Sequence, residues 1–326
     1  MPLSVGLVGA GSAALRAHLP ALGRATEAGV AAISAVCDPS PERRALVRER
    51  CPAASEHVDV EELLEEARPD LLVVASPPSS HLPALRAAAA REVDVLCEKP
   101  LGLRGEDVAA LGELRSTHSH LLLATVHQYQ HAPAWGVIAP ALRQGVLRGE
   151  PLALTVEVER PGTDPLSAGG WRAAGLREGG VLGDHAVHYL ALCWSVDPAA
   201  RLLDVSQEGD PGAETARLRV AIGAGTATIT VSYAGRRRRN LVAAHLAARG
   251  LGLRWLDGEL GIAEEGVART VEPTVALSDR QAVNDLYGPL YDELLARRED
   301  PAWRSERGAE TLGVASLLAA ALDALR

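Results

Sequence analysis

The chain of 326 residues carries a formal net charge of -9, from 33 basic and 42 acidic side chains, and Lys99 is its only lysine. The acidic balance argues against a nucleic-acid binder, because neutralising phosphates requires clustered positive charge. Hydrophobic residues make up 47% of the chain, and its length suggests two domains, each with a core of its own. Arg can replace Lys wherever only a positive charge is needed, so Lys99 is a candidate for a role that requires an ammonium group.

The predicted first domain, residues 1–125, alternates short apolar strands with helical segments. Apolar strands bounded by helices are typical of a parallel sheet that is buried on both faces. We therefore predict an α/β fold with a doubly wound sheet. The predicted strands are residues 3–8, 30–37, 71–75, 93–97 and 120–126, and the predicted helices are residues 12–22, 41–50, 60–67, 82–91 and 105–116.

The pattern changes after residue 125, which predicts a second domain over residues 126–326. Consecutive strand candidates with turn signals between them indicate an open, mainly antiparallel sheet, so this domain is expected to be α+β. Gly and Pro are frequent in residues 161–180, which we interpret as a loop. The predicted strands are residues 152–160, 203–207, 216–222, 226–233, 241–248 and 251–256, and the predicted helices are residues 134–143, 181–194, 279–297 and 305–325.

Four consecutive arginines, Arg236 to Arg239, stand between Gly235 and Asn240, which are typical turn residues. We interpret this run as the solvated end of a hairpin. A clamp for a phosphorylated substrate or for a partner is the alternative.

Signals for other compartments and for zinc are weak. The four cysteines show no C-x-x-C spacing, which argues against a zinc ribbon or a thioredoxin-like motif, and buried thiols fit a cytoplasmic location. No uncharged apolar run approaches the roughly 20 residues that cross a bilayer, so no membrane partner is expected. The first residues also lack the basic region of a signal peptide.

A glycine loop follows the first strand, with the pattern G-x-G-x-x-A over Gly9 to Ala14. Gly9 permits a tight turn, Gly11 lets backbone amides approach a pyrophosphate, and Ala14 lets the next helix pack on the strand. The N-terminus of that helix favours negative charge. Because the loop follows a strand and opens a helix, it predicts a Rossmann dinucleotide-binding domain, with cofactor contacts from Gly9, Gly11, Ser12 and Ala13.

Asp38 stands at the end of the second predicted strand. An acid there can accept hydrogen bonds from both adenosine ribose hydroxyls, and it would repel a 2′-phosphate. The sequence therefore favours NAD as the cofactor. NADP stays open, because Arg43 and Arg44 could contact a 2′-phosphate. Asp38 could instead cap the following helix.

Three side chains suggest alcohol oxidation. Lys99 follows a parallel strand, at the edge where open α/β sheets bind ligands. Asp184 and His188 are four residues apart, so they share one face of a predicted helix. Removing a hydride from an alcohol needs a base for the hydroxyl proton, and His has a suitable unperturbed pKa. An ammonium group can hold the reacting oxygen, and a carboxylate can orient the imidazole or the substrate.

Together these motifs resemble those of the Gfo/Idh/MocA family, the glucose–fructose oxidoreductase and inositol dehydrogenase group, and the resemblance extends over the whole chain. Besides the glycine loop it rests on four segments. These are Glu98-Lys99-Pro100-Leu101, the strand-end loop Ala75 to His81, the segment His127 to Pro133 that opens the second domain, and the G-G-x-x-x-D-x-x-x-H motif of Gly179 to His188.

The resemblance implies an enzyme that transfers a hydride between a hydroxyl carbon of a sugar, an inositol or a related cyclitol and a nicotinamide cofactor. It implies that His188 is the general acid/base, that Lys99 holds the reacting oxygen and that Asp184 orients the imidazole or the substrate. A homo-dimer or homo-tetramer through the second-domain sheet is also implied. Expected cofactor contacts further include Asp38, Arg43, Ser76, Pro77, His81, Glu98 and Lys99, and expected substrate contacts are Lys99, Gln128, Trp171, Arg172, Asp184, His185 and His188.

Some of these residues have competing structural interpretations. Trp171 could be an aromatic platform or a packing residue, and His185 could line the pocket or pack. Asp184, His185 and His188 converge poorly on one ion, so no metal site is predicted. The chain has Gln130-His131 where many relatives have Arg-Phe, which removes a substrate contact that the Arg would supply.

Other functions remain open for the same fold. One is glycoside cleavage by transient oxidation with bound NAD. Another is a cofactor-bound sensor without catalysis, although such proteins usually lose the catalytic side chains that this chain retains. The physiological direction is open as well, so the reaction could be reduction of a keto-sugar or an imine.

Overall fold

The computed structural model describes residues 1–162, 175–210, 212–271 and 274–326, and the chain divides into two compact units. Unit 1 comprises Met1–Leu101, Glu106–Val126 and Tyr287–Leu312. Unit 2 comprises Gly102–Gly105, His127–Leu286 and Gly313–Arg326. A late segment of the chain, Tyr287–Leu312, thus packs with the N-terminal residues, which a division of the sequence into contiguous ranges cannot show.

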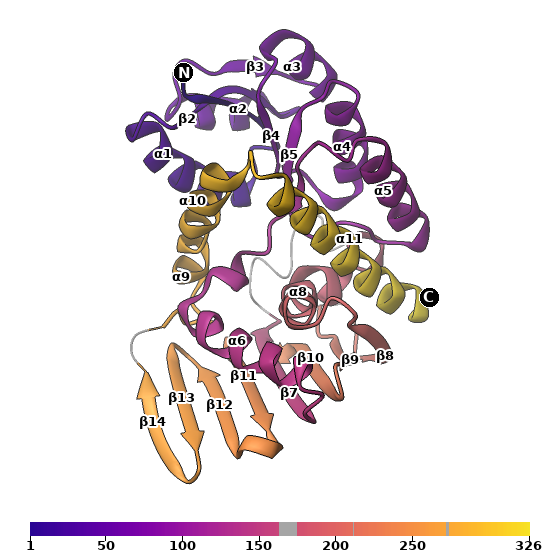
Figure 1. The fold of residues 1–326 in the computed structure, drawn as a ribbon. Coiled ribbons are helices and arrows are strands. Elements are labelled where there is room, and N and C mark those ends of the chain that lie inside the picture. The colour runs from indigo at the N-terminus through magenta and orange to yellow at the C-terminus, as the bar shows by residue number, and fades with distance from the viewer. Residues whose placement is uncertain (163–174, 211, 272–273) are drawn as a thin grey trace. The chain divides into compact units, whose positions relative to one another are not determined.

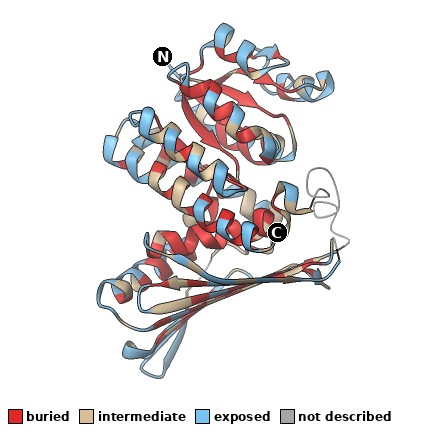
Figure 2. Ribbon diagram, turned by 90° about the vertical axis from the view of Figure 1, so that its right-hand side faces the viewer, coloured by how far each residue is buried: buried red, intermediate tan, exposed pale blue. Residues whose placement is uncertain are grey.

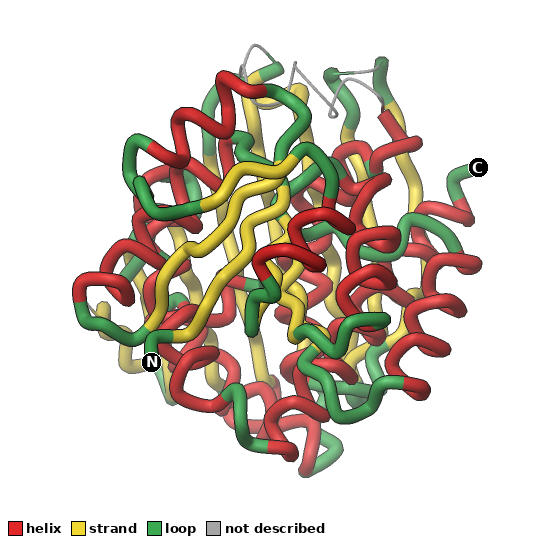
Figure 3. Tube along the Cα trace, turned by 90° about the horizontal axis from the view of Figure 1, so that it is seen from above, coloured by secondary structure: helices red, strands yellow, loops and turns green. Residues whose placement is uncertain are grey.

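Unit 1 is built on a parallel six-stranded sheet with the strand order β3-β2-β1-β4-β5-β6. The order reverses between β1 and β4, which confirms the predicted doubly wound fold. Helices flank the strands (Figures 1 and 3). The strands are β1 (Leu3–Val8), β2 (Ala31–Cys37), β3 (Ser55–His57), β4 (Leu71–Val74), β5 (Asp94–Cys97) and β6 (Leu123–Thr125). The helices and helical turns are η1 (Ala14–His18), α1 (Leu19–Glu27), α2 (Pro41–Arg48), α3 (Val60–Ala67), η2 (Pro78–Ser80), α4 (His81–Ala89), α5 (Gly105–Thr117) and α10 (Tyr287–Arg297).

The first helix differs from its prediction over residues 12–22. It begins with a π-helical turn, η1, and continues as α1 to Glu27. Pro20 lies inside this continuous helical segment, directly after the π-helical turn, rather than near the end of a helix. The short strand β3 was not predicted, because only one of its three residues is buried.

The core of unit 1 combines the sheet with the returning C-terminal segment. Leu7, Val36 and Leu71 from the strands are fully buried in one cluster with Tyr291 and Leu290 of α10. Helix α10 also lies beside α1 (Figure 1). Helix α10, although it lies late in the sequence, is therefore a part of the unit 1 core.

Unit 2 contains an eight-stranded sheet with the order β14-β13-β12-β11-β7-β10-β9-β8. All neighbouring strands are antiparallel except β7 and β10, which confirms the prediction of an open, mainly antiparallel sheet. The strands are β7 (Leu152–Pro161), β8 (Arg201–Glu208), β9 (Thr215–Ile222), β10 (Gly225–Gly235), β11 (Arg239–Leu246), β12 (Leu251–Leu256), β13 (Glu259–Glu264) and β14 (Val267–Val271). The last two were not predicted, and β14 has almost no buried residue.

One face of this sheet is covered by helices and the other is exposed (Figure 2). Strand β7 shows why: Val156 and Val158 are buried, whereas Glu157 and Glu159 alternate with them on the exposed face. The helices and helical turns are η3 (Gln128–His131), α6 (Pro133–Leu147), η5 (Leu182–Ala186), α8 (Val187–Val196), η6 (Ala247–Arg249), α9 (Arg280–Asp285) and α11 (Pro301–Ala324), of which α11 begins in unit 1.

Two details of the sequence prediction are wrong. The single helix expected over residues 279–297 is two helices, α9 and α10, because Pro289 has no N–H with which to continue the α9 ladder. The arginine run is a turn, as expected, but it is not a hairpin end. It joins β10 to β11, and β7 lies between these two strands. Within the described residues, no helix combines the length and apolar character needed to cross a membrane.

Candidate active site

The glycine loop after β1 has two glycines with different surroundings. Gly9 has a φ of +89°, and a Cβ on it would lie 2.6 Å from the backbone nitrogen of Ser76. Only glycine fits this close approach between the ends of β1 and β4. A Cβ on Gly11 would meet no atom within 4 Å, so the backbone there faces open space. The helical turn that follows begins at Ser12, which is exposed. The loop thus has the room and the N–H orientation that a pyrophosphate requires.

Asp38 follows β2 and is buried. Its Oδ2 accepts a hydrogen bond of 2.9 Å from the Ala10 backbone, and its Oδ1 accepts one of 2.9 Å from the Ser40 backbone. The carboxylate therefore fixes the glycine loop against the end of β2. Helix α2 is capped by Ser40, which accepts from the Arg43 backbone, so the alternative in which Asp38 is the cap is wrong.

The two arginines near Asp38 differ in their contacts. Arg44 donates to the Asp38 carbonyl at 2.7 Å and to Glu56 at 3.1 Å, so its guanidinium supports the loop. Arg43 has a side chain that is 60% exposed and lies 3.9 Å from the Asp38 carboxylate. Of the two, Arg43 is the one placed to reach a ligand at Asp38.

The loops after β4 and β5 are joined by His81. Its Nδ1 lies 3.0 Å from the Pro100 carbonyl and its Nε2 lies 2.8 Å from the Ser76 carbonyl. The ring is almost fully buried, whereas Pro77 beside it is exposed. His81 therefore holds together the two loops that carry the predicted nicotinamide-side contacts.

Glu98, which precedes Lys99, is buried in a polar cluster. Its Oε1 lies 3.0 Å from Nε2 of His18 and accepts a 2.5 Å hydrogen bond from the Tyr287 hydroxyl. Its Oε2 accepts from the Lys99 backbone N–H at 3.2 Å. The other ring nitrogen of His18 lies 2.7 Å from the Tyr291 hydroxyl. Both carboxylate oxygens of Glu98 thus accept hydrogen bonds. Lys99, the next residue, is half-buried.

The cluster favours an ionised Glu98. Burial raises the pKa of this carboxyl, but the hydrogen bond and charge of His18, the charge of Lys99 and the hydrogen bond of Tyr287 lower it, and the net pKa is lowered. An ionised carboxylate can only accept, so His18 carries a proton on Nε2. Glu98 is a fixed anion beneath the loop that presents Lys99.

In unit 2, Asp184 lies in the π-helical turn η5 and is buried. Its Oδ2 accepts a 2.8 Å hydrogen bond from the hydroxyl of Tyr233 on β10. Nε2 of His185 lies 3.6 Å from the same oxygen, and the His185 ring meets the Tyr233 ring edge-on at 5.7 Å. Such π turns are frequent at functional sites. Asp184, His185 and Tyr233 form one cluster against the inner face of the sheet.

His188, one turn later in α8, is also buried. Its ring stacks on Tyr129, with centroids 4.1 Å apart and planes 12° from parallel. A phenol face stabilises an imidazolium ring above it. Burial raises the pKa of Tyr129, with Arg160 acting in the opposite direction through its charge and a hydrogen bond, so the phenol stays neutral. Arg160 is itself buried and donates to Asn240 at 2.8 Å.

Gln128 is the remaining predicted substrate contact that the structure describes. It is buried, and its Oε1 has no hydrogen-bond partner among the described residues. Buried acceptors are nearly always satisfied, so such an atom calls for a ligand or a water. Trp171 and Arg172 lie outside the described residues.

The sequence did not reveal the side chains that hold these groups. His18, Tyr287 and Tyr291 around Glu98, and Tyr233 at Asp184, belong to no motif. Their partners lie 49 to 273 residues away in the chain. Only the fold brings them together.

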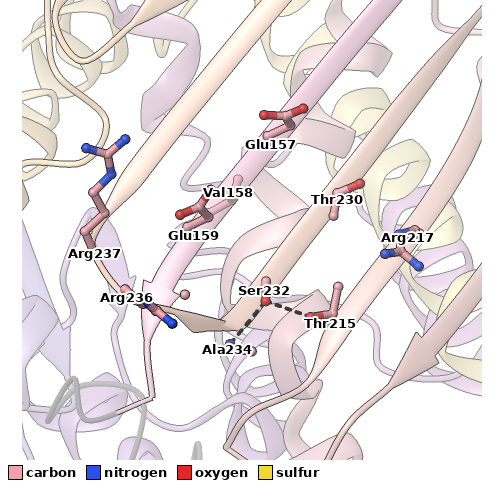
Figure 4. Close-up of a pocket in the computed structure, with 11 residues that line it drawn as sticks. Glu157, Val158, Glu159, Thr215, Arg217, Thr230, Ser232, Ala234, Arg236 and Arg237 are labelled. Atoms are coloured by element: carbon pink, nitrogen blue, oxygen red, sulfur yellow. Dashed lines mark hydrogen bonds between the residues drawn. The ribbon is translucent and has the colours of Figure 1, made fainter.

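A hollow of about 960 Å³ lies on the exposed face of the unit 2 sheet, over β7, β9 and β10 (Figure 4). Glu157, Glu159 and Arg217 line it, with a 2.7 Å hydrogen bond between the hydroxyls of Thr215 and Ser232. None of the predicted catalytic residues lines it. The chemistry expected of this chain therefore belongs to the covered face, where Asp184 and Tyr233 meet.

Comparison with known proteins bears on the family. The oxidoreductase family with an NAD-binding Rossmann fold, GFO_IDH_MocA, matches residues 3–125. Inositol 2-dehydrogenase 4 of Saccharopolyspora erythraea is 32% identical over 160 residues, 47% of this chain and 44% of that protein. The matches to the curated relatives cover about half of their length or less.

Solved structures share the fold over nearly the whole chain. An oxidoreductase from Agrobacterium radiobacter, in complex with NAD+, L-tartaric acid and magnesium, has a TM-score of 0.81 at 18% identity, over 99% of this chain and 96% of that one. A levoglucosan dehydrogenase in complex with NADH and levoglucosan has a TM-score of 0.77 at 18% identity, over 99% and 97%. Residues 3–125, which carry the glycine loop, Asp38 and the Glu98-Lys99 strand end, are therefore the NAD-binding Rossmann fold of the Gfo/Idh/MocA family of oxidoreductases.

Proposed function

We propose that the protein is an NAD(P)-dependent dehydrogenase or reductase that acts on a hydroxyl carbon of a sugar, an inositol or a related cyclitol. The observation that carries the proposal is the pair of buried residues Asp184 and His188 on one helical segment, each held by a tyrosine. A buried acid and a stacked imidazole on successive turns suit proton transfer to or from an alcohol better than they suit a structural core.

The residues of unit 1 fit a dinucleotide. Gly11 leaves space for the pyrophosphate, and the N–H groups of Ser12 and Ala13 start a helix. Asp38 retains lone pairs for ribose hydroxyls, since each of its oxygens accepts one hydrogen bond from the backbone. We propose NAD as the cofactor, with the exposed Arg43 as the residue that would admit NADP. When bound, the nicotinamide ring accepts or returns the hydride.

Each of the remaining side chains has a separate role in the proposed reaction. His188 takes the hydroxyl proton at a ring nitrogen as the hydride leaves carbon, and it returns that proton in the reverse direction. The Lys99 ammonium donates a hydrogen bond to the reacting oxygen and stabilises the charge that develops on it. Asp184, fixed by Tyr233, orients a substrate hydroxyl or the imidazole. Ser76, Pro77 and His81 shape the nicotinamide side of the cofactor site.

Two of the relatives and one buried acceptor atom without a partner support the proposed substrate class. Inositol 2-dehydrogenase and levoglucosan dehydrogenase are named for polyhydroxylated rings. Gln128 offers a buried acceptor that a ring hydroxyl would satisfy. We propose His185, Trp171 and Arg172 as further contacts to such a ring.

Steady-state turnover with a panel of sugars and cyclitols, read at the absorbance of the reduced nicotinamide, tests the proposal. Lys99→Ala is expected to lower kcat by about 10²–10³, the cost of losing one charge-stabilising donor, while cofactor binding stays within about twofold. Lys99→Arg should also fail, because a planar fork does not replace a compact ammonium. Turnover of Lys99→Ala at the wild-type rate would contradict this mechanism.

The same panel separates the other readings of the fold. Release of sugar from a glycoside without net NADH would indicate cleavage by transient oxidation. Tight cofactor binding with no turnover on any polyol would indicate a sensor. The buried, tyrosine-held Asp184 and His188 favour the dehydrogenase over the sensor.

We also propose a homo-dimer or homo-tetramer through the exposed face of the unit 2 sheet. Glutamates 157 and 159 stand there near Arg217 and Arg239, so two copies related by a two-fold axis could pair opposite charges. Light scattering of the wild type and of Arg217→Glu measures this. A wild-type monomer at all concentrations would contradict it.

A further inference from the structure

A cluster unrelated to the dehydrogenase site lies at the edge of the unit 1 sheet. His57 ends β3, and Glu62 and Glu66 are four residues apart on α3, so they share one helix face. Nδ1 of His57 lies 3.9 Å from a carboxylate oxygen of each glutamate. The three atoms all lie within 4.8 Å of one another.

The Nε2 side of the His57 imidazole is held by Ser55. Its Nε2 lies 2.8 Å from the Ser55 hydroxyl, and that hydroxyl donates its only proton to the Ser34 carbonyl at 3.4 Å. When the Ser55 hydroxyl donates to Ser34, its oxygen accepts from Nε2–H, and this tautomer leaves the lone pair on Nδ1. A ring nitrogen fixed in this way by a hydrogen bond on the other nitrogen is the usual arrangement of a metal-binding histidine.

The lone pair of Nδ1 has no hydrogen-bond partner among the described residues, although His57 is only 3% exposed. At 3.9 Å the two carboxylates are too far away to share a proton with it. In the tautomer with the proton on Nε2, a buried lone pair faces two carboxylates, which is unfavourable because all three groups present negative charge density to one point. A cation at that point satisfies all three.

The spacing also suits a cation. Zn²⁺ binds imidazole nitrogen and carboxylate oxygen at about 2.0–2.2 Å, so neighbouring ligand atoms around a tetrahedral ion lie about 3.4 Å apart. The glutamate side chains are 44% and 66% exposed, so their carboxylates can make the shift from 3.9 Å to about 3.4 Å that closure around the ion requires. The Glu62 carboxylate also accepts a long 3.4 Å hydrogen bond from the Val58 backbone, which such a shift can break.

We propose that His57, Glu62 and Glu66 bind a zinc ion, with water in the fourth position. One imidazole and two carboxylates suit Zn²⁺ better than Mg²⁺, which prefers an octahedron of oxygens. The ion joins the edge strand β3 to α3. The His57 carbonyl accepts from the backbone N–H of Asp38 at 3.2 Å, so the ion also braces the strand end that carries the ribose-side acid.

Calorimetric titration of ZnCl₂ into untagged, chelator-treated full-length protein tests the site. Wild type is expected to bind one zinc ion per chain, and Co²⁺ in its place should give the visible absorption of a four-coordinate ion. Glu66→Gln and His57→Gln should weaken zinc binding by at least about tenfold, and Ser55→Ala by roughly tenfold through loss of the tautomer-fixing contact.

Glu65→Gln is the matched control. It removes the same charge from the same helix at an exposed position next to Glu66. Unchanged zinc affinity in Glu65→Gln together with weaker binding in Glu66→Gln supports a site with defined ligands. Equal losses in both variants would mean general attraction to acidic surface, and no stoichiometric binding by wild type, or wild-type affinity in Glu66→Gln, would overturn the proposal. Because Glu66 is exposed, its variant is expected to fold even if His57→Gln does not.

Discussion

Two buried carboxylates, Glu98 in unit 1 and Asp184 in unit 2, stand next to predicted catalytic groups, and they are held differently. Glu98 has both oxygens engaged, by His18, Tyr287 and the Lys99 backbone. These partners join the end of β5 to η1 and to α10. Asp184 is held by Tyr233 from the neighbouring sheet and lies near His185 on its own helix.

The two patterns of contacts suggest a structural role for Glu98 and a role in the reaction for Asp184. A carboxylate whose oxygens serve three internal donors from distant segments is an anchor, and its loss should appear first in stability. A carboxylate held by a tyrosine hydroxyl in a helical turn, one turn before a stacked histidine, is positioned for a reaction, and its disturbance should appear first in turnover. Glu98 is nevertheless expected, from the family resemblance, to contact a cofactor ribose, so measurements on both residues decide whether the distinction is real.

The largest effect is expected for Glu98→Gln. The amide leaves at least one of the buried donors without an acceptor, which should lower the free energy of unfolding by about 3 kcal/mol. Urea denaturation measures it. Glu92→Gln, at an exposed side chain paired with His118 and His120, is the control and should change stability far less, because solvent screens an exposed ion pair. A loss for Glu98→Gln as small as that of the control would show that Glu98 is not an anchor.

The difference in stability between wild type and Glu98→Gln should depend on pH. The pKa of Glu98 in the folded protein is lowered from its usual 4.5, so its ionised form contributes stability that is fully present above pH 4.5. This contribution is lost as the pH falls through the lower folded-state pKa. The stability gap between wild type and Glu98→Gln should therefore be constant at neutral pH and narrow below pH 4.5. A stability difference that widens on acidification would contradict the assignment of Glu98 as an ionised carboxylate.

The glycine loop also contains one residue with a structural role, Gly9, and one that we assign to the cofactor, Gly11. Gly9→Ala places a Cβ 2.6 Å from the Ser76 backbone at a φ of +89°, which should cost about 2 kcal/mol of stability. Gly11→Ala meets no atom within 4 Å, so stability should stay within about 0.5 kcal/mol while NAD affinity falls by about tenfold. Urea denaturation and NADH fluorescence give the two values. Equal stability losses would contradict the assignment of Gly11 to the cofactor.

The sequence predicted the parts of the fold and site that depend on neighbours in the chain. Apolar runs located the buried strands, because a strand covered on both faces must be apolar along its length. The glycine loop and Asp38 were found because their residues are local and their turn geometry needs glycine. Strands β3 and β14 were missed because edge strands bury too little to leave a pattern.

The supporting contacts could not be found in this way. Glu98 meets His18 across 80 residues and Tyr287 across 189. Nothing in the sequence around Tyr287 shows that α10 returns to the core of unit 1. Likewise, the i,i+4 spacing of Asp184 and His188 predicted a shared helix, but not the tyrosines that hold them. Long-range hydrogen bonds depend on topology, which a one-dimensional pattern does not contain.

Tyr233→Phe tests the assignment of Asp184 to chemistry. The substitution removes the 2.8 Å hydrogen bond to the carboxylate and keeps the ring that packs against His185. We expect kcat to fall by about tenfold, equivalent to about 1.4 kcal/mol, with cofactor affinity unchanged. Steady-state kinetics on the substrate found in the panel measure it. An unchanged kcat with reduced stability would make Tyr233 a structural residue.

Tyr287→Phe is the reciprocal test in unit 1 and should have the smallest effect. It removes the hydroxyl that donates to Glu98 at 2.5 Å, but His18 and the Lys99 backbone still hold the carboxylate. The free energy of unfolding should fall by about 1 kcal/mol, the usual net value of one hydrogen bond, and kcat should stay within about twofold. If Tyr287→Phe instead lowers kcat as much as Tyr233→Phe does, the position of Lys99 depends on the Tyr287 hydroxyl. Glu98 would then position the Lys99 ammonium, and both Glu98 and Asp184 would contribute to turnover.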